Sequence, residues 1–361
     1  MKEIEFNIKF ITPLLIGGAN PWQVDPAGLT GKALRGCWRF WFRGMVGGMI
    51  KNIKVEELKQ LESLIFGSAG NKDSKNQEIG AKFKMLIEGG NKNIEDYELG
   101  FTRTFKCKGK GCKKCNYSGK IRPKSKGYPE NTVYSVKLIP RNNMSEAEIK
   151  VLIATIWLWG NLGAIGKRER RGFGSLILEL KNETNPFSFD LNEINIDFPL
   201  KESFEYTEEL EGHLQKGVSL VWKVYNQWIK EINFTTKKNL INDISSTPAP
   251  ENSTFFILQS FEQIFVGNKS FIDIDAIDNF HGDSTCKGLG WAEKKNRMAS
   301  PVFIRMHKIK KSSAENYLPV VTWCKQDKVN NKDPNNSALK YLKRNIDGQR
   351  VFERNLNGGS L

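Results

Sequence analysis

The sequence predicts an α+β protein with two ferredoxin-like domains in tandem, and three observations support this fold class. Apolar and polar residues alternate in several short segments, which indicates strands with one buried face. Helix start signals precede two apolar segments in the first half of the chain. The order in residues 1–180 is therefore strand, helix, strand, strand, helix, strand, which is the split βαβ pattern of the ferredoxin-like fold.

The first strand and the first helix have clear signals. Residues 3–11 alternate polar side chains with an apolar set, which is Ile4, Phe6, Ile8 and Phe10. A loop rich in glycine and proline occupies residues 17–28. Thr30 can accept a hydrogen bond from the first helical turn, so a helix is expected at residues 31–45.

The remaining elements of the first domain follow in order. Ser145 and Glu148 have the spacing of a capping box, which places the second helix at about residues 145–159. The domain is expected to span residues 1–185, with a basic, cysteine-containing insertion at about 103–126. Its other strands are expected at residues 81–88, 132–140 and 175–180.

The second half predicts a more diverged ferredoxin-like domain over residues 200–361. Residues 181–200 are polar and contain two prolines, which is typical of a linker. An amphipathic helix is expected at residues 208–232 and a last helix at 337–344. Strands are expected at residues 254–259, 301–308 and 318–324.

The charge of the chain is concentrated in its first half. The 361 residues carry 55 Lys and Arg against 40 Asp and Glu, a formal net charge of +15. Residues 1–180 hold 31 basic and 17 acidic residues, whereas residues 181–361 hold 24 and 23. This distribution favours a localised surface for a polyanion over a general bias in composition.

The sequence also predicts where the protein works. The N-terminus alternates polar and apolar residues, so no secretory signal is expected. The apolar segment 149–165 is expected to be a buried helix, not a membrane span. Six cysteines, three of them clustered, do not resemble a disulfide framework. We therefore expect a soluble cytoplasmic protein with no membrane contact.

The expected first helix has a basic edge without an acidic residue. At about 100° per residue, the four cations of this edge fall within roughly 80° of one another. Gly36 lies beside them, where a ligand could approach the backbone closely. A solvated charged face is the alternative, but such faces usually mix both signs of charge. The cations are Lys32, Arg35, Arg39 and Arg43, and Leu34, Cys37, Trp38 and Trp41 lie opposite.

A second basic feature is the glycine-rich turn at residues 163–175. Glycines allow a close backbone approach, and the turn adds four cations, which together suit a phosphate chain. A solvated turn after a helix is the alternative. Trp22 and Phe173, both on loops beside basic residues, are candidates for base stacking. The candidate residues of the turn are Lys167, Arg168, Arg170, Arg171, Gly172, Phe173 and Gly174.

The basic insertion contains three cysteines that could bind zinc. Residues 103–126 hold ten Lys and Arg and no acidic residue. Cys112 and Cys115 have the spacing of a zinc knuckle, and Cys107 is a third candidate ligand. A structural zinc needs a fourth ligand, which the sequence does not identify, and a reduced loop with incidental thiols is the alternative. No cofactor is expected to be required for function.

Nucleophilic and acid–base catalysis find little support in the sequence. The three histidines, His213, His281 and His307, all lie outside the basic half. Asp25, in the loop after the first strand, is the one carboxylate that could hold a metal or orient a ribose hydroxyl. A turn role before Pro26 is favoured over that interpretation.

Three segments resemble one protein family. Residues 34–43, LRGCWRFWFR, resemble the LRG-x-x-RFW-x-R helix of RAMP-superfamily proteins. Residues 171–175, RGFGS, are similar to the RAMP glycine-rich loop between the last helix and the last strand. Residues 297–301, RMASP, resemble a stretch of a second RAMP domain. Together they resemble the subunit numbered one in the Cmr series of type III-B CRISPR effector complexes.

The resemblance implies two ferredoxin-like domains, similar to RNA-recognition modules, and a non-catalytic RNA-binding role in antiviral defence. Such a subunit would hold guide RNA near its 3′ part, target RNA, or both, beside other RAMP subunits. The basic helix edge and the residues 167–174 would line the RNA groove. Two alternatives stay open: a RAMP-type endoribonuclease that uses Asp25, and a mainly structural subunit whose basic face contacts acidic neighbours.

Overall fold

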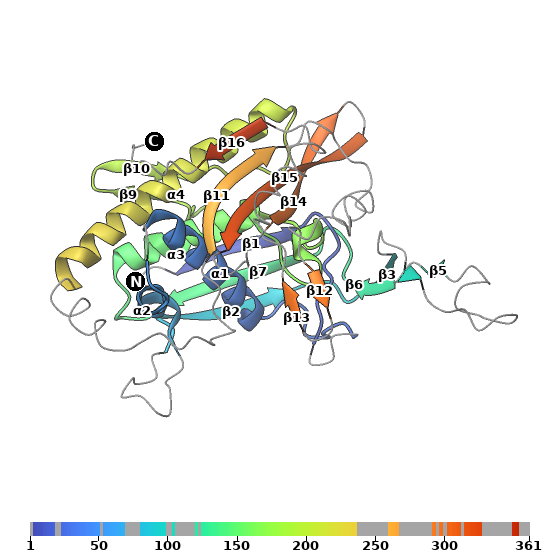
Figure 1. The fold of residues 1–361 in the computed structure, drawn as a ribbon, viewed down its shortest axis with the longest axis horizontal. Helices are drawn as coiled ribbons and strands as arrows, with labels where there is room; N and C mark the ends of the chain where they lie inside the picture. The colour runs from blue at the N-terminus through green and yellow to red at the C-terminus, as the bar shows by residue number, and fades with distance from the viewer. Residues whose placement is uncertain are drawn as a thin grey trace, which may run out of the picture.

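Two four-stranded antiparallel sheets form the framework of the computed structural model (Figure 1). Helices pack between the sheets and beside them. The structure describes residues 3–18, 23–50, 53–68, 80–98, 103–104, 120–121, 124–236, 259–266, 291–293, 296–298, 302–311, 314–326 and 349–353.

The first sheet has the order β2-β7-β1-β8, with every pairing antiparallel. In the chain the elements run strand, helix, strand, strand, helix, strand, so the predicted ferredoxin-like fold is confirmed. The strands are β1 (Ile4–Phe10), β2 (Phe83–Gly89), β7 (Val133–Pro140) and β8 (Leu176–Leu180). The helices are α1 (Gly31–Met49) and α3 (Glu146–Leu162).

Both helices cover the same face of the first sheet. Trp38 of α1 contacts Phe83 of β2 at a ring distance of 6.4 Å, and Gly160 of α3 packs against Leu178 of β8. The apolar residues of β1 point to this face and are buried, because alternate side chains of a strand lie on opposite sides.

The predicted helix caps are present. Thr30 Oγ1 accepts a hydrogen bond from the amide of Ala33 at 3.3 Å. Ser145 Oγ accepts from the amide of Glu148 at 3.2 Å, and Glu148 Oε2 accepts from the amide of Ser145 at 2.9 Å. The Glu148 carboxylate also contacts Lys82 Nζ at 2.6 Å, which ties the start of α3 to the start of β2.

A helix that the sequence analysis did not predict, α2 (Val55–Phe66), follows α1. Its apolar side buries Leu58, Leu61 and Ile65. Phe66 meets Phe42 of α1 at a ring distance of 5.6 Å. This contact places α2 along the flank of α1 that carries the basic edge.

The connection between β2 and β7 contains two short ribbons. β3 (Glu95–Glu98) pairs with β6 (Lys124–Gly127), and β4 (Arg103–Thr104) pairs with β5 (Lys120–Ile121). These strands extend away from the two main sheets (Figure 1). β4 and β5 lie within the basic insertion predicted at residues 103–126, β6 overlaps its end, and β3 precedes it.

The expected linker at residues 181–200 is not an unstructured connection. It contains a hairpin of β9 (Ser188–Leu191) and β10 (Ile194–Asp197). Apolar side chains anchor this hairpin to the core, which explains why the segment folds although its composition is polar. The buried anchors are Phe187, Leu191, Ile196 and Phe198.

The second sheet repeats the strand order of the first. Its order is β14-β15-β11-β16, again with antiparallel pairings. In both sheets the fourth strand pairs with the first, the first with the third, and the third with the second, as the ferredoxin-like fold requires. The strands are β11 (Gln259–Val266), β14 (Val302–Lys311), β15 (Ala314–Gln326) and β16 (Gln349–Glu353).

The other predictions for the second half have mixed outcomes. The helix expected at 208–232 is α4 (Thr207–Thr236), and a short hairpin joins β12 (Trp291–Glu293) to β13 (Asn296–Met298). The strand expected at 254–259 lies outside the described residues except at its end, and the helix expected at 337–344 lies wholly outside them. The boundaries 1–185 and 200–361 stay a prediction.

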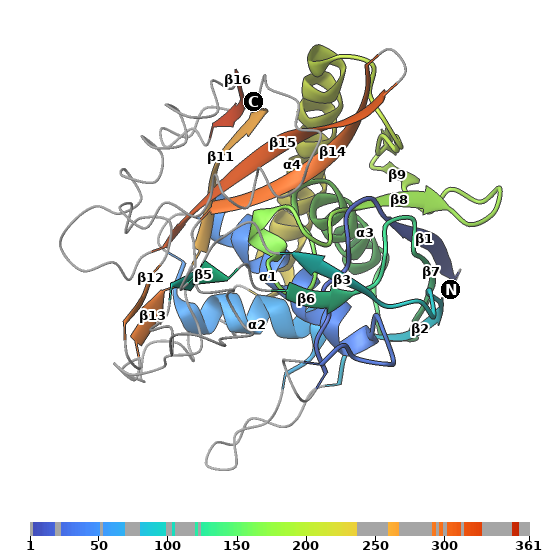
Figure 2. The ribbon, with the colours of Figure 1, turned by 90° about the vertical axis from the view of Figure 1, so that its right-hand side faces the viewer.

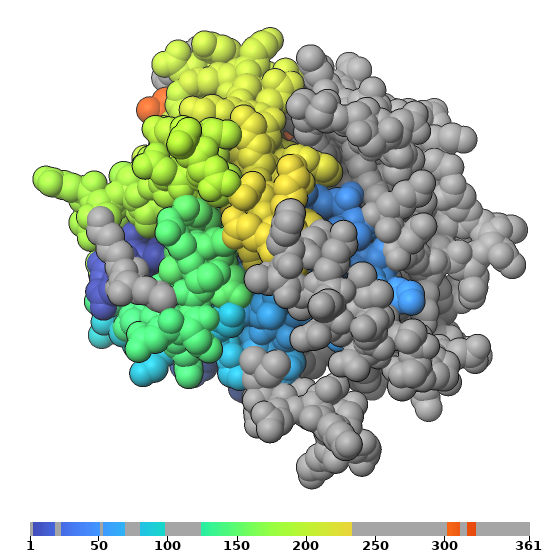
Figure 3. Space-filling view, turned by 90° about the vertical axis from the view of Figure 1, so that its left-hand side faces the viewer, coloured from blue at the N-terminus to red at the C-terminus, as the bar shows by residue number. Residues whose placement is uncertain are grey.

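Helix α4 joins the two halves by packing beside α3 (Figure 3). The hydroxyl groups of Thr155 on α3 and Tyr225 on α4 lie 2.6 Å apart in the buried contact. Helix α1 contacts both sheets, since it packs on β2 and also on β11 and β14 (Figure 2). In the part of the chain that the structure describes, no helix is long and apolar enough to span a membrane.

Candidate nucleic-acid interface

Helix α1 separates an apolar side from a basic edge, as the sequence predicted. On the edge, Lys32 and Gly36 are exposed, and the three arginines are half-buried. A Cβ on Gly36 would meet no atom within 4 Å, so a ligand backbone has room to approach the helix there. On the opposite side, the buried residues are Leu34, Trp38, Trp41 and Phe42.

Two arginines of this edge have an acidic partner that the sequence analysis did not identify. Arg39 Nε donates to Glu62 Oε1 of α2, and Arg43 Nη1 donates to both carboxylate oxygens at 3.1 and 3.3 Å. Arg39 Nη2 also donates to the carbonyl of Gly67 at 3.1 Å. In the folded protein the acidic residue Glu62 therefore lies against the basic edge, although α1 itself contains no acidic residue.

The other two cations of the edge are differently placed. The Arg35 guanidinium lies 5.7 Å from the centre of the Phe83 ring, and its Nε is buried without a hydrogen-bond partner in the described residues. Lys32 lies one helical turn before Arg35 and is exposed. Within the described part of the chain, Lys32 forms no ion pair. Among the four cations of α1, Lys32 and Arg35 are thus the most available to an external anion.

The glycine-rich turn owes its glycines to contacts within the chain. Gly172 (φ 89°) donates its amide to the carbonyl of Ile304 on β14 at 2.9 Å. Gly174 (φ 65°) leaves no room for a side chain, because a Cβ would lie 1.9 Å from the carbonyl oxygen of Ile165. Both glycines are buried. The expectation that they give a ligand access to the backbone is therefore wrong for Gly172 and Gly174.

The turn and the helix nevertheless contact each other. The turn contains a short 3-10 helix, η1 (Glu169–Arg171), which lies against β14. The Arg170 guanidinium lies 4.2 Å from the ring centre of Phe303 on β14 and 5.5 Å from that of Phe40 on α1. Arg170 is thus the contact between the basic turn and α1.

The electrostatics of the turn favour a positive surface. Burial raises the pKa of Glu169 to about 7, and nearby Arg170 opposes that rise. The carboxyl group consequently neutralises the surrounding cations less than a solvated glutamate would.

Burial also lowers the pKa of Lys167. It raises the pKa of the Cys37 thiol on α1, and the negative charge of Glu169 adds to that rise. A buried thiol with a raised pKa is a poor nucleophile.

Comparison with known proteins supports the sequence resemblance. The model of the RAMP superfamily matches residues 7–177, which include α1, α3 and the glycine-rich turn. By this match, residues 7–177 are similar to the RAMP superfamily. We call the part of the fold that contains the first sheet and its helices the RAMP domain.

Relatives and solved structures agree with this assignment. The chain is 28% identical over 196 residues to the CRISPR system Cmr subunit Cmr1-2 of Pyrococcus furiosus, a match that covers 51% of this chain and 98% of the relative. The crystal structure of apo Cmr1 from Pyrococcus furiosus has a TM-score of 0.51 at 16% identity, over 98% of this chain and 99% of that one. A type III-B Cmr-beta complex bound to cognate target RNA contains a chain with a TM-score of 0.52 at 11% identity, over 93% and 98%.

The open face of the first sheet is not a base-stacking platform. RNA-recognition modules stack bases on aromatic residues of their sheet, whereas the outward positions of these four strands hold no aromatic residue. Lys9 contacts Glu179 at 3.5 Å there and also pairs with Glu202. The open face of the first sheet therefore lacks the aromatic side chains on which RNA-recognition modules stack bases.

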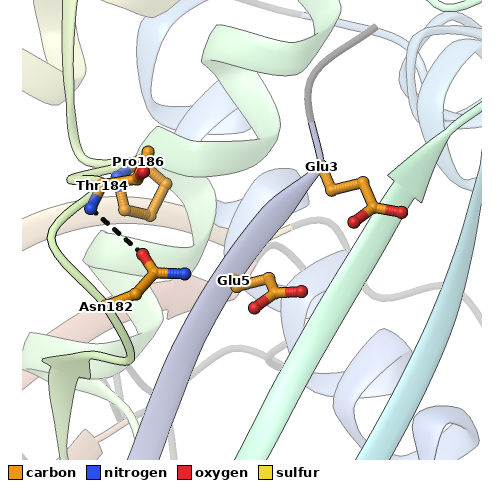
Figure 4. Close-up of a pocket in the computed structure, with 5 residues that line it drawn as sticks. All are labelled: Glu3, Glu5, Asn182, Thr184 and Pro186. Carbon is orange, nitrogen blue, oxygen red and sulfur yellow. Dashed lines mark hydrogen bonds between the residues drawn. The ribbon is translucent and has the colours of Figure 1, made fainter.

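A pocket of about 260 Å³ lies beside Glu5, on the open face of the first sheet (Figure 4). Glu5 on its wall contacts Lys137 at 3.2 Å and Lys181 at 3.4 Å, and the hydrogen bond to Lys137 is the main reason that the pKa of Glu5 is lowered. The lowered pKa of Glu5 keeps a negative charge on the wall, which disfavours a phosphate ligand. The lining residues are Glu3, Glu5, Asn182, Thr184 and Pro186.

The two aromatic candidates for stacking have different outcomes. Phe173 is fully buried, so the expectation that it stacks on a base is wrong. It lies between two glycines with positive φ, whose backbone turns the side chain into the core. Trp22 lies outside the described residues.

Asp25 has the turn role that the sequence analysis favoured. Its Oδ1 accepts a hydrogen bond from the amide of Ala27 at 3.0 Å, and its carbonyl accepts from Tyr128 Oη at 2.7 Å. A hydrogen bond in which an aspartate side chain accepts from the amide two residues later is typical of an Asx turn. In the described residues, no group of three or more His, Cys, Asp or Glu could hold a metal ion. Cys107, Cys112, Cys115 and His281 lie outside the described residues.

A buried polar network joins residues that lie far apart in the chain, so the sequence alone does not predict it. Arg305 Nη1 on β14 donates to the carbonyl of Asn161, near the C-terminus of α3, at 2.8 Å. His307 Nε2 lies 2.9 Å from the same carbonyl, and His213 Nε2 of α4 lies 2.9 Å from Asn161 Oδ1. The network ties α3, α4 and β14 together. Alternation along residues 301–308 was the one available signal, since it places Arg305 and His307 on one face.

Proposed function

We propose that this chain is a non-catalytic RNA-binding subunit of a type III-B CRISPR effector complex. It would hold guide RNA near its 3′ part, target RNA, or both, beside other RAMP subunits. The binding surface consists of the basic edge of α1 and the cations of the glycine-rich turn. These residues are Lys32, Arg35, Arg39, Arg43, Lys167, Arg168, Arg170 and Arg171.

The observation that carries this proposal is the contact between two basic segments that lie far apart in the chain. Arg170 joins the turn to α1 through Phe40, and the exposed Lys32 and Gly36 extend the same surface. Most of the excess positive charge also lies in the RAMP half of the chain. Phosphate contacts of this kind position RNA without reading its sequence. The similarity to a chain of a complex bound to target RNA supports the same ligand class.

A catalytic role is less well supported. A general base must reach the proton it removes, whereas the Asp25 carboxylate is engaged by the Ala27 amide within its own turn. His213 and His307 are buried, which keeps both rings away from any bound RNA. We therefore favour a holding role over RNA cleavage.

Charge reversal tests the proposal on the purified chain. Fluorescence anisotropy would measure binding of a labelled single-stranded RNA to a Lys32→Glu/Arg35→Glu variant. Each phosphate contact contributes about 0.7 logarithmic units per tenfold change in salt, so losing two contacts should weaken binding about 25-fold at about 0.1 M salt. The salt slope should fall by about 1.4.

The matched control is Lys84→Glu/Lys92→Glu, which makes the same charge change at two exposed lysines of the β2 region. The control should bind nearly as the unmodified chain does. Equal losses in both variants would point to non-specific electrostatics and reject the assigned surface. Metal-dependent RNA cleavage that disappears in Asp25→Ala would favour the endoribonuclease instead. Retention of the chain in a complex freed of RNA by nuclease would favour the structural alternative.

A further inference from the structure

Glu62 is an unusual residue for a helix that packs on a basic surface. Its side chain is 2% exposed, in a row with the apolar residues Leu58, Leu61 and Ile65 on the buried side of α2. Burying a carboxylate is costly unless ionic partners and hydrogen bonds compensate for the lost water. A residue with only a packing role would be apolar here, so the carboxylate needs another explanation.

The contacts of Glu62 supply that explanation. The carboxylate accepts hydrogen bonds from Arg39 Nε and from Arg43 Nη1, which lie one helical turn apart on α1. Arg39 is held a second time, by the carbonyl of Gly67 at the end of α2. Both guanidinium groups are therefore anchored on their inner side.

Both arginine side chains also keep a partly exposed surface. The side chains of Arg39 and Arg43 are 34% and 25% exposed. An arginine has five N–H donors in a planar fork, and Arg39 uses two of its nitrogen atoms for Glu62 and Gly67. Glu62, Arg39 and Arg43 together carry a formal net charge of +1.

We propose that Glu62 is a positioning residue, which holds Arg39 and Arg43 as a braced pair for phosphate groups of an RNA strand. This inference rests on the proposed function. Ordering a flexible side chain on binding costs roughly 2- to 12-fold in affinity, and a brace has already ordered these two. The buried carboxylate also weakens the attraction for phosphate, but at an effective dielectric constant of about 20 and with salt screening this effect is about fourfold, less than the cost of ordering two arginine side chains. The brace should therefore be the larger effect.

These opposing effects make Glu62→Gln a two-sided test in the full-length chain. Glutamine keeps the size and one acceptor oxygen, but its NH2 group would replace the Oε2 that accepts from Arg43 Nη1, and the hydrogen bonds that remain would lack the negative charge of the carboxylate. The positioning role predicts about tenfold weaker binding of labelled single-stranded RNA, even though the net charge becomes more positive. Glu56→Gln makes the same charge change on the same helix, at a site outside the cluster, and should tighten binding at most about twofold.

Charge-conserving variants make the test independent of the folding of Glu62→Gln. Arg39→Lys/Arg43→Lys keeps both positive charges but replaces the planar forks with flexible point charges, and should also weaken binding about tenfold. Adding Glu62→Gln to that variant should cause little further loss, because the same brace is already absent. Thermal unfolding would verify that each variant is folded at the assay temperature.

The outcomes separate this inference from the proposed function. Unchanged or tighter binding by Glu62→Gln, with the unmodified chain binding RNA, would overturn the positioning role and leave the RNA-binding surface in place. Unchanged binding by the double lysine variant would overturn it as well. Absence of RNA binding by the unmodified chain would overturn the proposed function and this inference together.

Discussion

Acidification should weaken the joint between the two sheets through the buried network around Asn161. Asn161 Nδ2 donates to the carbonyl of Trp157 at 2.9 Å, so its Oδ1 is the acceptor for the neutral ring of His213. Burial, together with the charge of Arg305, lowers the pKa of His213 to about 3. The pKa of His307 is also well below its usual range, for the same reasons.

The size of the effect follows from proton linkage. The folded-state pKa of His213 lies below the value of about 6.5 expected in the unfolded chain, so the unfolded state binds the extra proton. The contribution of His213 to stability is therefore fully present above pH 6.5 and declines as the pH falls towards 3. Between pH 7 and pH 5 the loss is about 2 kcal/mol for this one group.

The pH dependence of stability in the unmodified chain alone would not test this prediction, because Glu169 titrates in the same pH range. Its pKa is raised to about 7 by burial, so the folded state binds a proton more readily than the unfolded state does. Acidification from pH 7 to pH 5 therefore stabilises the fold through Glu169 by about 2 kcal/mol, which offsets the loss at His213. The comparison must be made between variants at each pH.

His213→Gln provides that comparison, because glutamine can still donate to Asn161 Oδ1 but does not titrate. Urea unfolding, followed by tryptophan fluorescence, would give the free energy of unfolding of both proteins at pH 7 and pH 5. We expect the unmodified chain to lose about 2 kcal/mol more than the variant over this interval. An equal change in both proteins would refute the buried, neutral state of His213.

Three further predictions concern stability and metal content. Gly174→Ala should lower the free energy of unfolding by more than about 2 kcal/mol, because the residue has positive φ and an added Cβ would collide with the carbonyl oxygen of Ile165. Gly36→Ala should instead stabilise α1 by up to about 1 kcal/mol, since a Cβ there meets no other atom. Thermal unfolding would compare the two variants. Ser145→Ala should cost about 1 kcal/mol in the same assay, because it removes the N-cap of α3. If the three clustered cysteines hold a structural zinc, elemental analysis of the purified chain should find one zinc per chain, and replacement of Cys112 and Cys115 by serine should abolish it.

Local signals predicted most of the framework of the fold. The alternation in β1 and the capping box at Ser145 depend on neighbouring residues alone, so both could be located from the sequence. Helix α2 was missed, although Leu58, Leu61 and Ile65 have helical spacing. The hairpin at residues 188–197 was missed because its polar composition hides four buried anchors.

The candidate site was harder to predict, because it depends on tertiary contacts. Sequence placed the arginines on one edge of α1, but the partnership of Arg39 with Glu62 requires the packing of α2 against α1. A glycine such as Gly174 allows either a ligand or another part of the chain to approach the backbone closely. In the structure the carbonyl of Ile165 occupies that space, which the sequence does not show. The same holds for Phe173, whose basic neighbours suggested an exposed ring.

Crosslinking tests the assigned RNA surface most directly. Single-stranded RNA that contains photoreactive uridines would be bound to the purified chain, irradiated and digested, and the crosslinked peptides identified by mass spectrometry. We expect crosslinks in residues 31–43 and 167–171, which form the two basic segments joined through Arg170. Crosslinks confined to the open face of the first sheet, with none in either segment, would contradict the account.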